Sequence, residues 1–188
     1  MHPNKCNILF LAIVLIACVN RRKETDTIKV SDKQNEEKFD SSSLQHNAAF
    51  VANAVNSNLF EIRLNDMAQT YASSIAVKQL AKNISNDFNK ANEEIQNIAA
   101  KENISIPEKM SDEFRNKYGD IQKKTGTDLD SSYIALSLND HNSIIQQYQY
   151  QINNGTDSIV KMWTTRQLPI LQKHLVSLQQ ILSGFQKN

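Results

Sequence analysis

The sequence predicts an all-α protein, folded as an antiparallel four-helix bundle with an extra short helix in the connection between the second and third long helices. Glycine and proline are rare: the 188 residues include four glycines and three prolines, against average frequencies of roughly 7% and 5%. From residue 44 onward, apolar residues recur at intervals of three and four, which places them on one face of a helix. The chain shows no alternating strand pattern and no sign of a second domain.

The first half of the bundle is predicted to contain two long helices, over residues 44–71 and 74–101. In the first, one face carries the apolar residues Phe50, Ala54, Leu64, Ala68 and Tyr71. In the second, the apolar stripe consists of Val77, Leu80, Ala81, Ile84, Phe88, Ala91, Ile95 and Ile98. Ile106-Pro107 should end the helical stretch, since the residue before a proline disfavours the helical region.

The second half of the bundle begins with the short helix, predicted over residues 108–124 and followed by a helix stop at Gly126. A third long helix is expected over residues 128–152 and a fourth over residues 156–186, joined by an Asn-Asn-Gly turn. Pro169 should kink the fourth, because a proline inside a helix removes one hydrogen bond and clashes with the preceding turn.

The N-terminus has the pattern of a secretory signal peptide over residues 1–17. Lys5 precedes an apolar run of about ten residues, too short to span a bilayer permanently. The run ends in Leu-Ile-Ala-Cys, which looks like a bacterial lipobox with Cys18 as the acylated N-terminus of the mature protein. We therefore expect an exported protein, anchored by its lipid in the bacterial cell envelope. Because Val19 rather than an acid follows the cysteine, the expected site is the outer membrane, facing the periplasm.

Residues 18–43 are expected to form the lipidated cysteine and a flexible tether, and residues 44–188 the bundle domain. The tether is rich in charged and small polar residues and offers little apolar surface to bury. Beyond the signal peptide, 20 basic residues balance 20 acidic ones, which argues against a nucleic-acid partner. Attachment to the membrane then depends on the lipid. With Cys18 acylated and Cys6 removed, the fold has no thiol for a disulfide, a metal or catalysis.

Four ionisable residues fall on the apolar faces of the predicted helices: Glu61, Asp140, His141 and His174. A buried ionisable group costs several kcal/mol unless it is paired or changes its protonation state. Glu61, His141 and His174 could therefore converge as metal ligands or a proton-transfer site. Alternatively, they could form a polar network in which each group satisfies another. The sequence leaves both interpretations open.

The metal interpretation lacks the expected motif. Di-metal bundles carry Glu-x-x-His on two helices, whereas Leu138 and Leu171 stand three residues before the two histidines. The scattered glycines form no phosphate-binding loop, and no motif for catalysis is visible. We therefore expect a protein that is not an enzyme and holds no cofactor, with a divalent metal as the alternative.

Several segments together resemble one bacterial envelope family, domain of unknown function 4142. The matching positions are Glu61, Asp130, Tyr133, His141, Leu168, Pro169 and His174. The resemblance implies a ferritin-like bundle over about residues 48–182, and it supplies no activity. One departure stands out: the family pattern has a histidine where this chain has Phe88. The sequence thus favours a binding or structural protein, and the alternative is a metal-binding or redox bundle that uses Glu61 and the two histidines.

Overall fold

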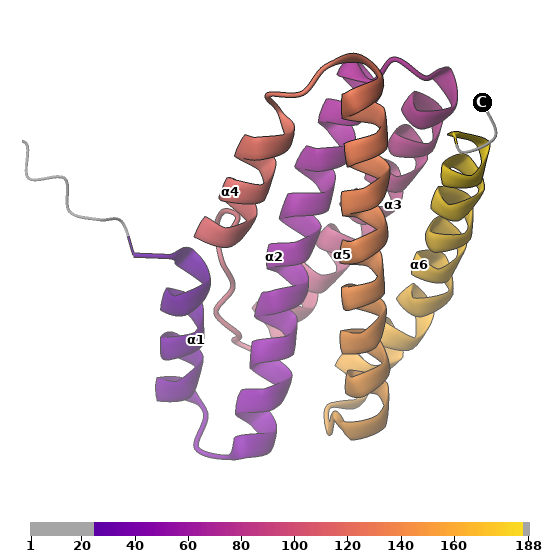
Figure 1. The fold of residues 1–188 in the computed structure, drawn as a ribbon. Helices are drawn as coiled ribbons and strands as arrows, with labels where there is room; N and C mark the ends of the chain where they lie inside the picture. The colour runs from indigo at the N-terminus through magenta and orange to yellow at the C-terminus, as the bar shows by residue number, and fades with distance from the viewer. Residues whose placement is uncertain (1–24, 186–188) are drawn as a thin grey trace, which may run out of the picture.

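The computed structural model describes residues 25–185, and within this range every regular element is an α-helix (Figure 1). The predicted all-helical fold is therefore confirmed, whereas the predicted signal peptide and Cys18 lie outside the described residues. None of the described helices combines the length and the apolar character that crossing a membrane requires. In chain order the helices are α1 (Thr27–Lys38), α2 (Ser42–Tyr71), α3 (Ile75–Lys101), α4 (Asp112–Ile121), α5 (Gly126–Asn154) and α6 (Ser158–Phe185).

Four long helices form the body of the molecule. Short turns connect α2 to α3 and α5 to α6, so each pair packs side by side in opposite directions (Figure 1). The two pairs meet where α2 packs on α5 and α3 packs on α6. The short α4 lies outside, against α2 and α5, and α1 lies against α2.

The expectation of a flexible tether through residue 43 is wrong for residues 27–38, which form α1. This helix is held by polar contacts to the connection between α3 and α4. The Asn35 side chain donates to the carbonyl of Ser105 at 2.8 Å and accepts from its N–H at 2.7 Å, while Lys38 donates to the carbonyl of Asn103. A composition argument counts apolar surface alone, and therefore misses a helix that is stabilised by hydrogen bonds to loop backbone.

Side-chain caps explain several helix boundaries. Ser74 and Ser111 accept hydrogen bonds from backbone N–H groups in the first turns of α3 and α4, which satisfies donors that a helix end leaves free. The cap at Ser111 makes the short helix begin later than residue 108. Gly126 was expected to stop a helix and instead begins α5, with a φ of 61° that glycine adopts without strain.

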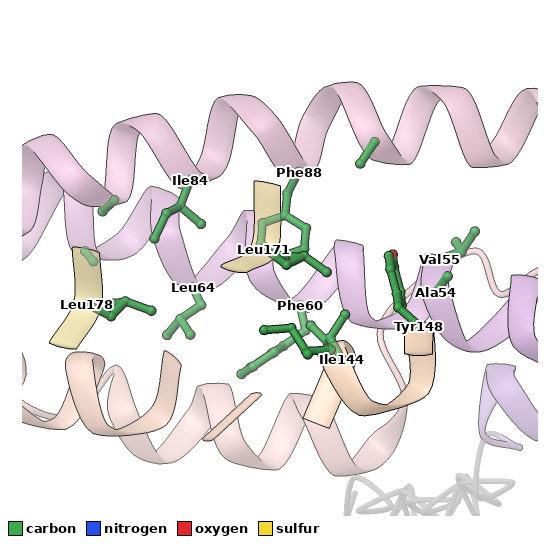
Figure 2. Packing of buried hydrophobic residues seen from close by; sticks show 14 of the residues in the cluster. Ala54, Val55, Phe60, Leu64, Ile84, Phe88, Ile144, Tyr148, Leu171 and Leu178 are labelled. Atoms are coloured by element: carbon green, nitrogen blue, oxygen red, sulfur yellow. The ribbon is translucent and has the colours of Figure 1, made fainter. Parts of the chain in front are cut away.

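The core lies between the four long helices. Leu64, Ile84, Leu171 and Leu178 point into the space between them, at most 4% exposed (Figure 2). Trp163 is also fully buried, which fits a core role. Tyr71 was expected to face inward, but as the last residue of α2 it is 70% exposed.

At each end of the bundle, one side chain forms hydrogen bonds with the turn that connects two other helices. At one end, both carboxylate oxygens of Asp130 on α5 accept from the N–H groups of Ser73 and Ser74, each at 2.8 Å, in the turn between α2 and α3. At the other end, Asn47 on α2 donates to Thr156, in the turn between α5 and α6, and accepts from Gln151 at 2.9 Å. These bonds set the relative positions of the helices that carry the candidate site.

Candidate functional site

The four ionisable residues that the sequence places on apolar faces are buried in the structure. Glu61 on α2 and His141 on α5 are 0% exposed, His174 on α6 is 5% exposed, and Asp140 on α5 is 8% exposed. They come from three different helices at the middle of the bundle. Their contacts therefore decide between a shared ligand site and a polar network.

The His141 imidazole has a polar neighbour at each nitrogen. Nδ1 lies 2.9 Å from the carbonyl oxygen of Ser137, one helical turn earlier, and 3.7 Å from Oε1 of Glu61. Nε2 lies 3.4 Å from Nδ1 of His174. Since a carbonyl oxygen can only accept, Nδ1 of His141 is the nitrogen that carries a proton. Nε2 is then free to accept one from His174.

His174 connects this buried pair to the surface. Its Nε2 lies 3.1 Å from Oδ2 of Asp87 on α3, and the Asp87 side chain is 39% exposed. A hollow of about 280 Å³ opens there, lined in part by Lys90 and Lys173. A chain of polar contacts thus runs from solvent at Asp87 through both imidazoles to Glu61.

Glu61 is held from its other side by residues of α2 and α5. The side chain of Asn65 donates to Oε2 at 2.9 Å, and the Tyr133 hydroxyl donates to the Asn65 oxygen at 2.5 Å. Oε1 of Glu61 has no hydrogen-bond partner among the described residues. One carboxyl oxygen is therefore fixed, and the other faces His141 without a hydrogen bond.

The chain from Ser137 to Asp87 has room for one more proton than two neutral imidazoles supply. It contains three polar contacts: Ser137–His141, His141–His174 and His174–Asp87. Each needs one hydrogen, and each neutral imidazole provides one. With both rings neutral, one of the three contacts has no hydrogen. The arrangement can therefore accept a single proton from the Asp87 side.

Burial favours the neutral forms throughout this network. It raises the pKa of Glu61 well above its usual range, and the nearby Asp140 raises it further, against the Asn65 hydrogen bond. Burial lowers the pKa of His141 to about 3, and the neighbouring His174 adds to this shift. It also lowers the pKa of His174, with the Asp87 contact opposing the change. At neutral pH we therefore assign neutral imidazoles, and burial favours the protonated form of Glu61.

Asp140 belongs to a different group of side chains. One of its oxygens lies 3.6 Å from Nζ of Lys117 on α4, and Lys117 is 2.9 Å from Glu113. Burial raises the pKa of Asp140, while Lys117 opposes that shift. The structure thus separates Asp140 from the histidine chain, except for its electrostatic effect on Glu61.

Glu61, His141 and His174 do not converge on one point. Glu61 lies beside Nδ1 of His141 and His174 beside Nε2, at opposite edges of the same ring. One metal ion cannot take ligands from both edges of an imidazole and still be bound by all three groups. Within residues 25–185, no group of three or more His, Cys, Asp or Glu side chains is arranged to hold a metal.

Phe88 fills the space beside the two imidazoles. Its ring centroid is 5.6 Å from that of His141 and 6.0 Å from that of His174, and its side chain is 3% exposed. The cavity that remains between Phe88, His174 and Tyr148 measures about 10 Å³, roughly the volume needed to hold one water molecule. The residue that departs from the family pattern therefore closes the site.

The remaining family-pattern residues contribute hydrogen bonds or core packing to the fold. Asp130 fastens the turn between α2 and α3, and Tyr133 joins the Glu61 network through Asn65. Leu168 packs against the core, and Pro169 lies exposed inside α6, five residues before His174.

Two members of the network were not found from the sequence. Asn65 follows Glu61 by one helical turn, a spacing that could have pointed to it. Asp87 lies on a partly exposed face of α3, and no sequence pattern relates it to His174 on α6.

The fold and the site together define a helical-bundle protein with a buried carboxyl–histidine network that reaches the surface at one aspartate. The chain belongs to the family of domain of unknown function 4142, whose model matches residues 32–181. No match to the chain was found among curated proteins or among solved structures.

Proposed function

We propose that this protein is a lipid-anchored helical bundle of the bacterial cell envelope that acts by binding or as a structural component, without catalysing a reaction. One observation supports a non-catalytic role above all. The His141 imidazole is surrounded by Ser137, Glu61, His174 and Phe88 and is 0% exposed. A general base must reach the proton it abstracts within hydrogen-bond distance, and these side chains occupy the space around His141 that a substrate would need.

The arrangement of the helices supports a ferritin-like topology. The α2–α3 and α5–α6 hairpins pack against each other, and the long connection through α4 joins them. Bundles of this type have one long crossover connection between two helical hairpins. Here the interior of the bundle is filled by the hydrogen-bonded network and Phe88, rather than by four converging carboxylates.

Attachment through Cys18 is tested by the Cys18→Ser variant. A serine cannot take the thioether-linked lipid, so the variant should lack labelled fatty acid and should retain residues 1–17. The measurement is fatty-acid labelling together with membrane fractionation of the native and variant chains. Normal labelling and normal outer-membrane fractionation of the variant would refute lipid anchoring at this residue.

Metal content distinguishes the proposed binding or structural role from the alternative of a metal-binding or redox bundle. We expect the native protein to purify without a stoichiometric metal, because its three candidate ligands point to different places. Phe88→His adds a third imidazole next to His141 and His174, and it should bind Zn²⁺ more tightly than the native chain. Elemental analysis that finds one tightly held metal per native chain, lost in His174→Ala, would overturn the proposal in favour of the metal-binding alternative.

A further inference from the structure

A groove runs along the seam between α2 and α5, outside the histidine network. The ten residues of α4 are too few to cover the full length of helices with 30 and 29 residues. Where α2, α4 and α5 meet, a hollow of about 280 Å³ is enclosed on three sides. A second, more open hollow of about 520 Å³ lies beside it, and Asn53 and Gln147 line both. Together they have the size of a small-molecule site, which is about 300–1,000 Å³.

Asp140 forms part of the inner wall of this groove. It is 8% exposed, with one oxygen 3.6 Å from Nζ of Lys117 and the other without a hydrogen-bond partner among the described residues. Nζ of Lys117 also contacts Oε1 of Glu113 at 2.9 Å, which is closer than its contact with Asp140. A buried carboxylate oxygen without a donor is costly. The χ2 torsion of an aspartate is broad and roughly two-fold. Rotation about it can therefore turn either carboxylate oxygen of Asp140 towards the groove.

Apart from Asp140 and the Glu113–Lys117 ion pair, the polar groups of the inner hollow are uncharged. Five of them are amides or hydroxyls, from α2 and α5: Asn53, Asn56, Ser57, Ser143 and Gln147. The Asn56 amide is bonded to Ser111 through both its nitrogen and its oxygen. Side chains such as Ser57 and Gln147 both donate and accept hydrogen bonds, as the hydroxyl groups of a sugar do. Phe60 and Phe114, stacked with centroids 4.5 Å apart, and Ile144 supply the apolar part of the wall.

The outer hollow adds an exposed aromatic side chain. Tyr150 is 57% exposed and meets His46 edge to face, with ring centroids 5.4 Å apart; both line the outer hollow. The C–H groups of a sugar ring carry a small positive charge and pack on the negative face of an aromatic ring. An aromatic platform beside an amide-rich hollow is suited to two successive rings of one chain.

We propose that the groove between α2 and α5 binds a short neutral saccharide, with Asp140 accepting hydroxyl hydrogens from the inner ring and Tyr150 packing on the outer one. This inference rests on the proposed binding role. Asp140 and Glu113 outnumber Lys117, the single cation of the inner hollow, and so disfavour phosphorylated or carboxylated ligands by like-charge repulsion. The amide-lined inner wall disfavours apolar ligands, because its polar groups would lose their water without new partners.

The test is an NMR titration of the purified full chain with two probes, maltotriose and tri-N-acetylchitotriose. Binding of at least one probe should shift the side-chain amide signals of Asn53 and Gln147, with a dissociation constant in the millimolar range or below. Asp140→Asn keeps the shape of the side chain but removes its charge, and it should weaken binding about tenfold, the effect of about 1.4 kcal/mol. Gln147→Ala and Tyr150→Ala should each weaken it severalfold.

The Gln147 and Tyr150 variants keep the test informative even if the Asp140 variant fails to fold, and each has a matched control. Gln149→Ala and Tyr71→Ala remove the same residue types at exposed positions away from the groove, and they should bind as the native chain does. Failure of both probes to shift the groove signals, or equal losses in groove and control variants, would overturn the saccharide site. Either result would leave the lipid-anchoring and metal measurements, which test the proposed function, unaffected.

Discussion

Glu61 is the residue at which protonation and stability are most closely linked. It is fully buried, one of its oxygens has no hydrogen-bond partner within residues 25–185, and burial together with Asp140 raises its pKa. In the unfolded chain it ionises near pH 4.5, the ordinary value. Between that pH and the raised folded pKa, the folded state binds more protons than the unfolded state. The fold therefore loses stability as the pH rises through this window.

Glu61→Gln should stabilise the bundle at neutral pH. Glutamine keeps the shape of the side chain and an oxygen for Asn65, and it does not ionise when the chain unfolds. We expect a gain of up to about 1.4 kcal/mol for each pH unit between 4.5 and the folded pKa, shrinking to nothing as the pH falls towards 4.5. Chemical denaturation of both chains across this range measures it. A variant that is less stable than the native chain at pH 7 would show that a charged Glu61 is needed.

At the scale of the helices, α1 shows how polar contacts order a segment that carries little apolar surface. Asn35 is 2% exposed and makes two hydrogen bonds with the backbone of Ser105. The same two bonds fix the connection that leads from α3 to α4. Docking of α1 and the position of this connection are therefore coupled.

Asn35→Ala should release α1 from the bundle and loosen the connection. The substitution leaves the N–H and carbonyl of the half-buried Ser105 without their side-chain partner, at a cost of about 1–3 kcal/mol. Hydrogen exchange should speed up in α1 and around Ser105, with the four long helices unchanged. Gln34→Ala is the matched control, since Gln34 is exposed on the same helix. Unchanged exchange at Ser105 in Asn35→Ala would contradict this coupling.

The elements that the sequence predicted correctly depend on local pattern. The stripe through Ile84 and Phe88 marked the buried face of α3, and the glycine-poor composition indicated an all-helical fold. The burial of Glu61 and the histidines also followed from helical spacing. Helix α1 did not, because its stabilising partners are backbone groups some 70 residues away. The pairing of His174 with Asp87 across 87 residues was equally inaccessible, since spacing reports faces within a helix and not the register between helices.

For the molecule as a whole, the buried acid and the buried histidines have opposite effects on how stability changes with pH. Lowered histidine pKa values cost stability as the pH falls below about 6.5, where the unfolded histidines take up protons. Glu61 has the reverse effect above pH 4.5. Two histidines against one acid leave a net uptake of up to one proton on unfolding, so the native chain should lose up to about 1.4 kcal/mol per pH unit as the pH falls between these values. Glu61→Gln removes the opposing acid and should lose up to about 1.4 kcal/mol per pH unit for each of two protons.

Denaturation curves of Glu61→Gln at pH 6.5 and pH 5 test this balance. A variant that loses no more than about 1.4 kcal/mol per pH unit, the slope of a single proton, would mean that Asp87 and its neighbours hold one histidine as an imidazolium. In that case the series of polar contacts from Ser137 to Asp87 already carries its additional proton near neutral pH.

The protonation state of the two histidines decides most directly whether the bundle contains a closed, neutral network. Long-range ¹H–¹⁵N NMR of the full chain at pH 7 and pH 5 measures it. We predict that His141 shows a neutral imidazole with its proton on Nδ1 at both pH values, since burial lowers its pKa to about 3. A His141 signal that titrates near pH 6.5, or that shows a metal-bound ring nitrogen in the native protein, would contradict the account.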